Sequence, residues 1–267
     1  MQEYNNIDRQ IHWLSQVIAK ANRAYVPEQE DESHTNLYID TLGMRMMGRW
    51  IDSIRGRIML TLNFQSFSYQ WLDAEHNIIH EVSVLKQGME QLEISIAEFL
   101  TSLNLSTEAF LRPLHFEIPD YKIEKLSRAD ISDEGLRSWF YFRDLANRAC
   151  QHMLGYLQLE SEIRTWPHHF DTGIFVQATD HLGLGFGMAM KDTMVGQAYF
   201  YISGYSGEYP ISYENIKPLS AGKWLSGEHW KGAVLPLNEL PDSSSEKALK
   251  MIQLFIKETS DRFINKS

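Results

Sequence analysis

Apolar and polar residues alternate most clearly between residues 170 and 203, where the pattern predicts three consecutive strands. Successive side chains of a strand point to opposite faces, and Pro167 favours an extended Trp166 just before the first strand. One face of this first strand carries Phe170, Thr172, Ile174, Val176 and Ala178. The opposite face carries His169, Asp171, Gly173, Phe175, Gln177 and Thr179. A turn at residues 179–183 leads into the second strand, and residues 197–203 form the third.

The second strand has glycine at every other position, Gly183, Gly185 and Gly187, which we call the glycine stripe. Glycine weakens a strand because it costs backbone entropy and offers no side chain to pack. The stripe therefore predicts that something approaches this face closely. A helix or neighbouring backbone is one interpretation, and the floor of a ligand groove is the other. A dinucleotide-binding loop is excluded, since the spacing is not Gly-x-Gly-x-x-Gly and the context is mid-strand.

If the three strands form a meander, the face with the glycine stripe, which we call the glycine face, is also polar and aromatic. It would gather His169, Asp171, Gln197, Tyr199 and Tyr201. A floor of small residues, surrounded by polar and aromatic side chains, is typical of a ligand pocket. Farther along the chain, Trp224 and Trp230 are candidates for a wall of such a pocket.

The remaining pattern predicts helices before and after strands in both halves of the chain. Apolar residues at helical spacing predict helices over residues 6–25, 88–103, 132–159 and 246–264. Alternation predicts strands over residues 57–64, 67–71, 78–85 and 233–237. Residues 37–55 are rich in Met and Gly without a clear period, and we favour a helix there. The fold class that follows is α+β, with mainly antiparallel sheet covered by helices.

The domain organisation predicted from this order is a single compact α+β protein over residues 1–267. The order helix, strands, helix occurs twice, in residues 6–104 and 132–264, so two pseudo-equivalent halves that arose by duplication are a hypothesis. Residues 105–131 contain Pro113, Pro119 and scattered charges, which predicts an irregular connection between the halves.

The charge and the cysteine content of the chain limit which binding partners and which cellular compartment we expect. The net charge is −10 and no segment is strongly basic, which disfavours both nucleic acid and an anionic membrane surface as partners. Cys150 is the single cysteine, so an intrachain disulfide and a thiolate metal cluster are excluded and a reducing compartment is favoured. Neither a signal peptide nor a membrane span is evident in the pattern. We therefore expect a soluble, cytoplasmic protein, and the sequence leaves its oligomeric state open.

Three segments carry a resemblance to a known family. They are Trp-Pro-His-His-Phe-Asp at 166–171, Ala-Tyr-Phe-Tyr at 198–201, and Gly-Ala-Val-Leu-Pro at 232–236 before the last helix. Together they resemble an uncharacterised bacterial protein family with a Trp…Phe-Asp motif, over residues 160–260. In the first half only residues 50–60, with Gly-Arg-Ile-x-Leu, are similar. The family has no assigned activity, so the resemblance implies a fold neighbourhood and no catalytic residues.

Three functions remain open from the sequence. The first is a small-molecule-binding protein whose pocket lies over the glycine face, with His169, Asp171, Gly185, Tyr199, Tyr201, Trp224 and Trp230 as contacts. The second is a metal-dependent, hydrolase-like enzyme that holds a divalent metal through His169 and Asp171, which share one face of an extended strand while His168 lies on the other. The third is a structural or protein-interaction module in which the glycine face is covered. Nucleophile-elbow and phosphate-loop motifs are absent from the sequence.

Overall fold

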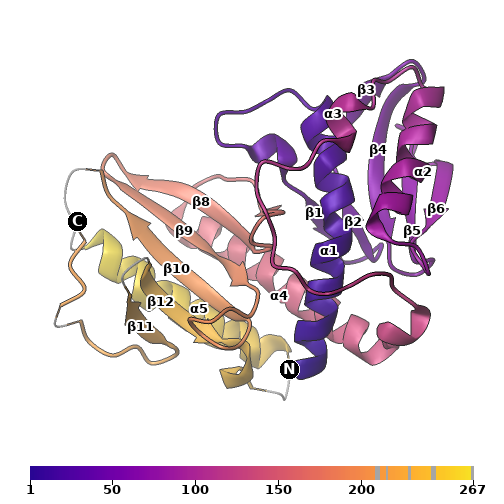
Figure 1. The fold of residues 1–267 in the computed structure, drawn as a ribbon. Coiled ribbons are helices and arrows are strands. Elements are labelled where there is room, and N and C mark those ends of the chain that lie inside the picture. Colours follow the sequence, from indigo (N-terminus) through magenta and orange to yellow (C-terminus); the bar gives the residue numbers. More distant parts are fainter. Residues whose placement is uncertain (208–210, 215, 228–229, 242–244, 266–267) are drawn as a thin grey trace. The chain divides into compact units, whose positions relative to one another are not determined.

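The chain divides into two compact units, shown in the ribbon of the computed structural model (Figure 1). The structure describes residues 1–207, 211–214, 216–227, 230–241 and 245–265. The N-terminal unit comprises Gln2–Phe140 and Thr165–Phe170, and the C-terminal unit comprises Met1, Tyr141–Arg164 and Asp171–Ser267. The boundary falls inside helix α4 (Asp133–Leu157). The predicted connection, residues 105–131, lies within the N-terminal unit instead of between two halves.

The N-terminal unit is an antiparallel sheet that follows one long helix. Its helices are α1 (Gln2–Tyr25), α2 (Met89–Ser102) and α3 (Glu108–Leu111). Its strands are β1 (Tyr38–Asp40), β2 (Arg45–Met47), β3 (Ile51–Ser53), β4 (Gly56–Asn63), β5 (Ser68–Leu72) and β6 (Ile78–Ser83). The sheet order is β1-β2-β4-β5-β6, and β3 pairs with β4. The strands predicted between residues 57 and 85, and the helices on either side, are confirmed.

The helix favoured for residues 37–55 is wrong, because this stretch forms the three short strands β1, β2 and β3. The turn between β1 and β2 explains the misleading pattern. The Asp40 carboxylate accepts hydrogen bonds from the backbone amides of Leu42 and Gly43, which stabilises a turn in place of a helical continuation. Met44 follows with a φ of 50°. Strands of three residues are too short for their alternation to be recognised.

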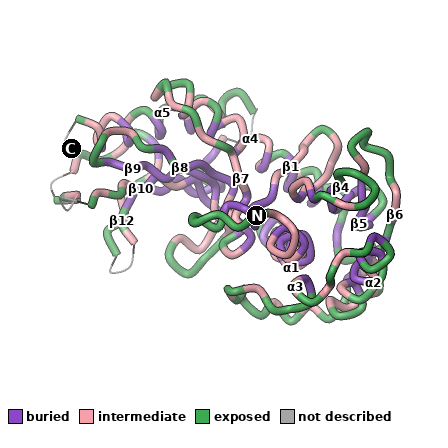
Figure 2. Tube along the Cα trace, turned by 90° about the horizontal axis from the view of Figure 1, so that it is seen from above, coloured by how far each residue is buried: buried purple, intermediate pink, exposed green. Residues whose placement is uncertain are grey.

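Helix α1 carries a buried polar row beside its apolar face. Figure 2, which looks down the axis of α1, shows this helix as largely buried. Asp8 accepts a hydrogen bond from the indole of Trp139 at 2.7 Å. Asn22 donates to the carbonyl of Asn36 and accepts from the amide of Arg49. Each of these side chains makes at least one hydrogen bond, as burial favours. The polar row thus fixes neighbouring segments of the N-terminal unit onto α1.

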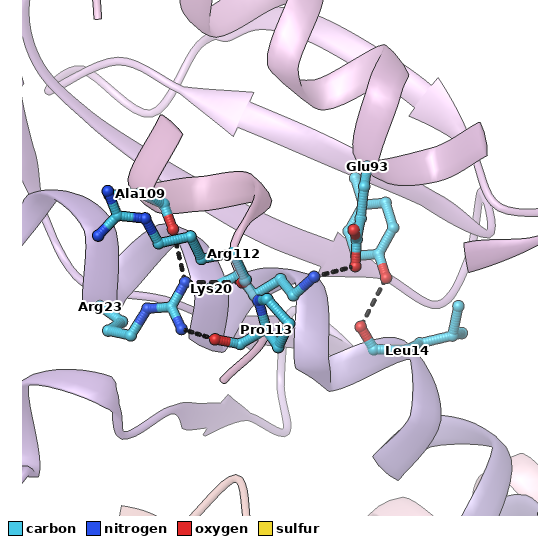
Figure 3. A network of polar contacts seen from close by, with 8 residues as sticks. Leu14, Lys20, Arg23, Glu93, Ala109, Arg112 and Pro113 are labelled. Carbon is cyan, nitrogen blue, oxygen red and sulfur yellow. Dashed lines mark hydrogen bonds and ion pairs between the residues drawn. The ribbon is translucent and has the colours of Figure 1, made fainter. Parts of the chain in front are cut away.

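A second set of contacts ties α1 to α2, β5 and α3 (Figure 3). Lys20 forms an ion pair with Glu93 of α2 at 2.6 Å, and the Tyr69 hydroxyl donates to the carbonyl of Leu14. Arg23 donates to the carbonyls of Ala109, Arg112 and Pro113. Burial raises the pKa of Tyr69 well above its ordinary value. The beginning of the 105–131 segment is therefore fastened to α1 by one guanidinium group.

The C-terminal unit is an antiparallel sheet with helices on its apolar face. The strands are β7 (Arg164–Thr165), β8 (Thr172–Thr179), β9 (Leu182–Ala189), β10 (Tyr199–Tyr205), β11 (Lys223–Ser226) and β12 (Lys231–Pro236), followed by α5 (Ser245–Ile264). The sheet order is β11-β12-β10-β9-β8-β7. The predicted meander of three strands is confirmed as β8, β9 and β10. The fold is therefore α+β with antiparallel sheets.

Helices α4 and α5 lie on the same side of this sheet (Figure 1). The two helices are joined by hydrogen bonds from Tyr156 to Asp261, at 2.5 Å, and from Gln253 to His152, at 3.4 Å. The Arg143 guanidinium of α4 donates to the Thr172 hydroxyl at the start of β8. These contacts place α4 and α5 against the apolar face of the sheet and leave the glycine face without a helix of this unit.

Both units share one order of elements, a long helix, an antiparallel meander and a further helix. The duplication itself stays a prediction. None of the helices in the described ranges combines the length and the apolarity needed to cross a bilayer.

Candidate functional site

The 166–171 segment forms a turn, not the beginning of a strand. The amide of Phe170 donates to the carbonyl of Trp166 at 2.7 Å, and Phe170 has a φ of 55°. The strand begins only at Thr172. The extended conformation predicted from Phe170 is therefore wrong, and the alternation that placed His169 and Asp171 on one face does not run through the turn. His169 is exposed in the N-terminal unit, whereas Asp171 belongs to the C-terminal unit.

Within the N-terminal unit this turn is held by α1. The carbonyl of Pro167 accepts hydrogen bonds from His12 Nε2 at 2.8 Å and from Gln16 at 2.9 Å. Because a carbonyl can only accept, the proton of a neutral His12 lies on Nε2, and its Nδ1 accepts from the Tyr121 hydroxyl. The Phe170 ring stacks on His12 with centroids 4.8 Å apart. These contacts give the motif a structural role as an anchor on α1.

Two predicted contact residues on the glycine face, Tyr199 and Tyr201, already have protein partners. The Tyr201 hydroxyl donates to Asp171 at 2.5 Å, and the Tyr199 hydroxyl donates to Asp192 at 2.7 Å. Burial, followed by the charge of Asp171, raises the pKa of Tyr201 well above its ordinary value. Both tyrosines therefore act as neutral donors that brace the sheet.

The glycine stripe is covered by aromatic side chains of neighbouring strands. A Cβ atom at Gly183 would lie 2.5 Å from the Phe175 ring, and one at Gly185 would lie 3.2 Å from the Tyr205 ring. On β12, a Cβ at Gly232 would lie 2.3 Å from the carbonyl oxygen of Ile202 on β10 and 2.6 Å from the Trp230 ring. Rings laid flat across a sheet need glycine beneath them. Of the two interpretations of the stripe, neighbouring backbone holds only at Gly187, where Thr172 O and the Cα of Gly173 are the closest backbone atoms.

These rings line an open groove with a volume of about 760 Å³ at the end of the sheet near the β8–β9 turn. Phe175 and Tyr205 are 50% and 51% exposed, although large aromatic side chains are usually well covered. Their ring centroids lie 5.8 Å apart. Trp230 contributes a third ring from the loop before β12. Three aromatic rings therefore contribute to the lining of the groove.

Polar groups are placed around the rings. The groove is also lined by Gln177, Asp180 and Lys231. The carbonyl of Lys231 accepts hydrogen bonds from the hydroxyls of Ser203, at 2.7 Å, and Tyr213, at 3.2 Å. Burial raises the pKa of Tyr213 to about 12. The Lys231 ammonium and the Asp180 carboxylate have no ion-pair or hydrogen-bond partner among the described residues.

The predicted site residues are therefore distributed over several places. Trp230 lines the groove, and Gly185 lies beneath the ring of Tyr205. Trp224 instead packs on the α5 side, with its ring centroid 5.6 Å from that of Phe263. Trp224 pairs in register with Ala233, whose side chain is on the apolar face, so the alternation of β11 turns Trp224 away from the glycine face.

Sequence reasoning did not select Phe175, Tyr205, Asp180 or Lys231 as contacts. A signal did exist for Phe175, because alternation placed this large apolar residue on the wetter face of its strand. Tyr205 continues the series Tyr199, Tyr201 and Ser203 two residues beyond the predicted end of the strand. Lys231 lies at the start of β12, and the sequence pattern gave no signal that it lines the groove.

No cluster of three or more His, Cys, Asp or Glu side chains suited to a metal ion occurs within the described ranges. His229, a candidate fourth ligand, lies outside them. Cys150 is fully buried, and burial raises the pKa of its thiol.

The chain matches no protein-family model, no curated protein and no solved structure. The resemblance to an uncharacterised bacterial family stays a prediction.

Proposed function

We propose that the protein binds a small organic molecule in the groove lined by Phe175, Tyr205 and Trp230. The observation that carries this proposal is the groove itself, about 760 Å³ in volume with half-exposed rings around it. Sites for small organic molecules span roughly 300–1,000 Å³ and combine apolar walls with a few polar groups. Gln177, Asp180 and Lys231 supply such polar groups.

The rings are suited to binding because two of them lie over glycines of the sheet. Phe175 and Tyr205 each rest on a glycine of β9, which holds the rings against the sheet. A ligand with a flat face gains area burial and about 0.5–1.5 kcal/mol of additional stabilisation for each well-placed aromatic pair. Pre-organised groups also reduce the entropy lost on binding.

Ligand-observed NMR with a set of aromatic fragments tests the proposal. We expect saturation transfer from the wild-type protein to fragments. Affinity should be about five- to thirtyfold weaker in the Phe175→Ala and Tyr205→Ala variants, since each loses a stacking surface worth about 1–2 kcal/mol. Leu254→Ala is the matched control, because Leu254 is a comparably exposed apolar residue on α5, at 41%. Thermal melting verifies that each variant is folded.

Light scattering distinguishes this function from a protein interface. A mass that rises with concentration in the wild type, and no longer does so in Tyr205→Ala, would assign the rings to an interface and overturn the proposal. We expect a mass that neither substitution changes.

A further inference from the structure

The described part of the groove lining has no permanently positive side chain directed at a ligand. Lys231 is the single lysine or arginine among these lining residues, and His181 is the one imidazole. The contact that Lys231 makes here is through its carbonyl, which accepts from the hydroxyls of Ser203 and Tyr213. Lys231 precedes Ala233 by two positions on β12, so alternation turns its side chain to the apolar face of the sheet. The groove is therefore poorly suited to neutralise an anion.

Asp180 and Gln177 supply the groove with a negative charge and an acceptor. Asp180 lies in the turn between β8 and β9. Gln177 and Gly183 pair on the glycine face, and Thr179 and Leu182 pair on the opposite face. Asp180 comes next in this alternation and so lies on the side of the glycine face, in agreement with its place in the groove lining. The amide nitrogen of Gln177 donates to the Thr179 carbonyl at 2.7 Å, which leaves its oxygen available as an acceptor.

The aromatic rings add to this electron-rich lining. The face of an aromatic ring carries partial negative charge and attracts cations, most strongly in Trp. Tyr205 rests on the sheet, with its ring atom Cε2 at 3.2 Å from the position of a Cβ on Gly185. Its other side is open, because Tyr205 is half exposed. The planes of Phe175 and Tyr205 differ by 57°, and rings set at an angle can contact one compact group together, as in aromatic sites for ammonium groups.

We infer that the ligand of this groove is an organic cation, an arylalkyl amine whose ammonium group is held by the ring faces and the Asp180 carboxylate. This inference rests on the proposed function and names the ligand class for the same site. The net charge of −10 acts in the same direction, because it raises the concentration of cations near the protein. An anion would instead meet a carboxylate and the negative faces of the rings.

Three indoles that share one scaffold and differ in charge are the probes. They are tryptamine, which is positive, tryptophol, which is neutral, and indole-3-acetate, which is negative. In NMR titrations at about pH 8, above the range in which imidazoles normally titrate, tryptamine should bind the wild type about fivefold more tightly than tryptophol. Indole-3-acetate should bind more weakly than tryptophol. The preference should shrink at high salt, because exposed charges are screened.

Two substitutions test the groups that hold the ammonium. Asp180→Asn should reduce the preference for tryptamine over tryptophol by about twofold, as expected for an exposed ion pair. Tyr205→Leu should also reduce this preference, because leucine keeps apolar contact but has no ring face. Glu239→Gln is the control, since it removes the same charge from an exposed position beyond the far end of β12. Thermal melting verifies that each variant is folded, and a ratio of two affinities is insensitive to a general loss of binding.

The outcomes separate this inference from the proposed function. Binding of tryptamine that is no tighter than that of tryptophol, or a preference that either Asp180→Asn or Tyr205→Leu leaves unchanged, overturns the cation assignment and leaves binding by the rings in place. A preference that Glu239→Gln reduces as much as Asp180→Asn does would make it a property of the net charge, and overturns the assignment as well. If no indole and no other aromatic fragment binds, the proposed function and the inference fail together.

Discussion

The glycines beneath the aromatic rings differ in what a methyl group would meet. At Gly187 the nearest atoms are the carbonyl oxygen of Thr172, at 2.7 Å, and the Cα of Gly173, at 2.9 Å. Both belong to the backbone of β8 and cannot move without separating the strands. At Gly183 the nearest atom is the tip of the Phe175 ring, at 2.5 Å, and this ring is half exposed and can turn away.

Alanine at these two positions should therefore have different effects. We expect Gly187→Ala to lower the free energy of unfolding by about 1–3 kcal/mol, the range for overpacking a rigid site. Gly183→Ala should cost less than about 1 kcal/mol but weaken fragment binding, because the displaced Phe175 ring leaves the groove. Urea unfolding measures the first effect and NMR titration the second. Equal losses of stability at both positions would show that the Phe175 ring is as immobile as backbone.

The position of the glycine stripe could be predicted from sequence, but its occupant could not. Period-two alternation assigned Gly183, Gly185 and Gly187 to one face without structural information. Which side chain lies over each glycine depends on the register of β8 and β10 against β9, where Phe175 and Ser203 flank Gly185. Register arises from the pairing between strands and cannot be read from the sequence of any single strand.

Among the elements, α1 organises the N-terminal unit through contacts that its apolar period does not reveal. The period of α1 predicted the helix, whereas its polar residues decide what is attached to it. Arg23 is the clearest case, since it donates to three carbonyls in the segment that begins at Ala109. The 105–131 segment contains few regular elements, so these bonds supply much of its order.

Replacing Arg23 should loosen this segment. We expect Arg23→Gln to increase the rate of chymotrypsin cleavage after Phe116 or Tyr121 by about fivefold, corresponding to roughly 1 kcal/mol of lost hydrogen bonding in an exposed setting. Arg112→Gln is the control. Among the residues that the structure describes, the Arg112 side chain pairs only with the exposed Glu108, and its carbonyl remains available to Arg23. Cleavage that is equally fast in both variants would argue that Arg23 does not hold the segment.

Local turns account for the elements that the sequence mispredicted. The 166–171 segment resembled the start of a strand because Pro167 favours extended neighbours. It folds as a turn because His12 and Gln16, more than 150 residues earlier, bind the Pro167 carbonyl. A contact over this separation overrides a local preference that is worth little by itself.

For the molecule as a whole, the class of fold followed from sequence but the boundary between units did not. The predicted connection at 105–131 was placed where regular patterns fade. The structure instead divides the chain at Phe140 and Tyr141, within α4. The apolar spacing of α4 continues across this point, from Trp139 and Phe140 to Ala146 and Cys150, so periodicity gives no sign of a boundary.

The stability of the whole chain should decrease as the pH falls from 7.5 to 5.5, because of one histidine in each unit. Burial lowers the pKa of His80 in the N-terminal unit and of His152 in the C-terminal unit. The folded state therefore binds protons less readily than the unfolded state, whose histidines titrate near 6.5. The contribution of these two histidines to the free energy of unfolding is therefore fully present above about pH 6.5 and is lost as the pH falls through and below this value.

Urea unfolding at pH 5.5, 6.5 and 7.5 measures this dependence. The imidazole of His80 stacks on the Phe99 ring, with the two ring centroids 4.2 Å apart. The substitution His80→Phe keeps an aromatic ring at this position and removes the titrating group. We expect this variant, and more so the double variant with His152→Phe, to lose less stability between pH 7.5 and 5.5 than the wild type. A dependence that the double variant retains in full would mean that other groups take up the protons on unfolding, and that burial of these two imidazoles is not linked to stability.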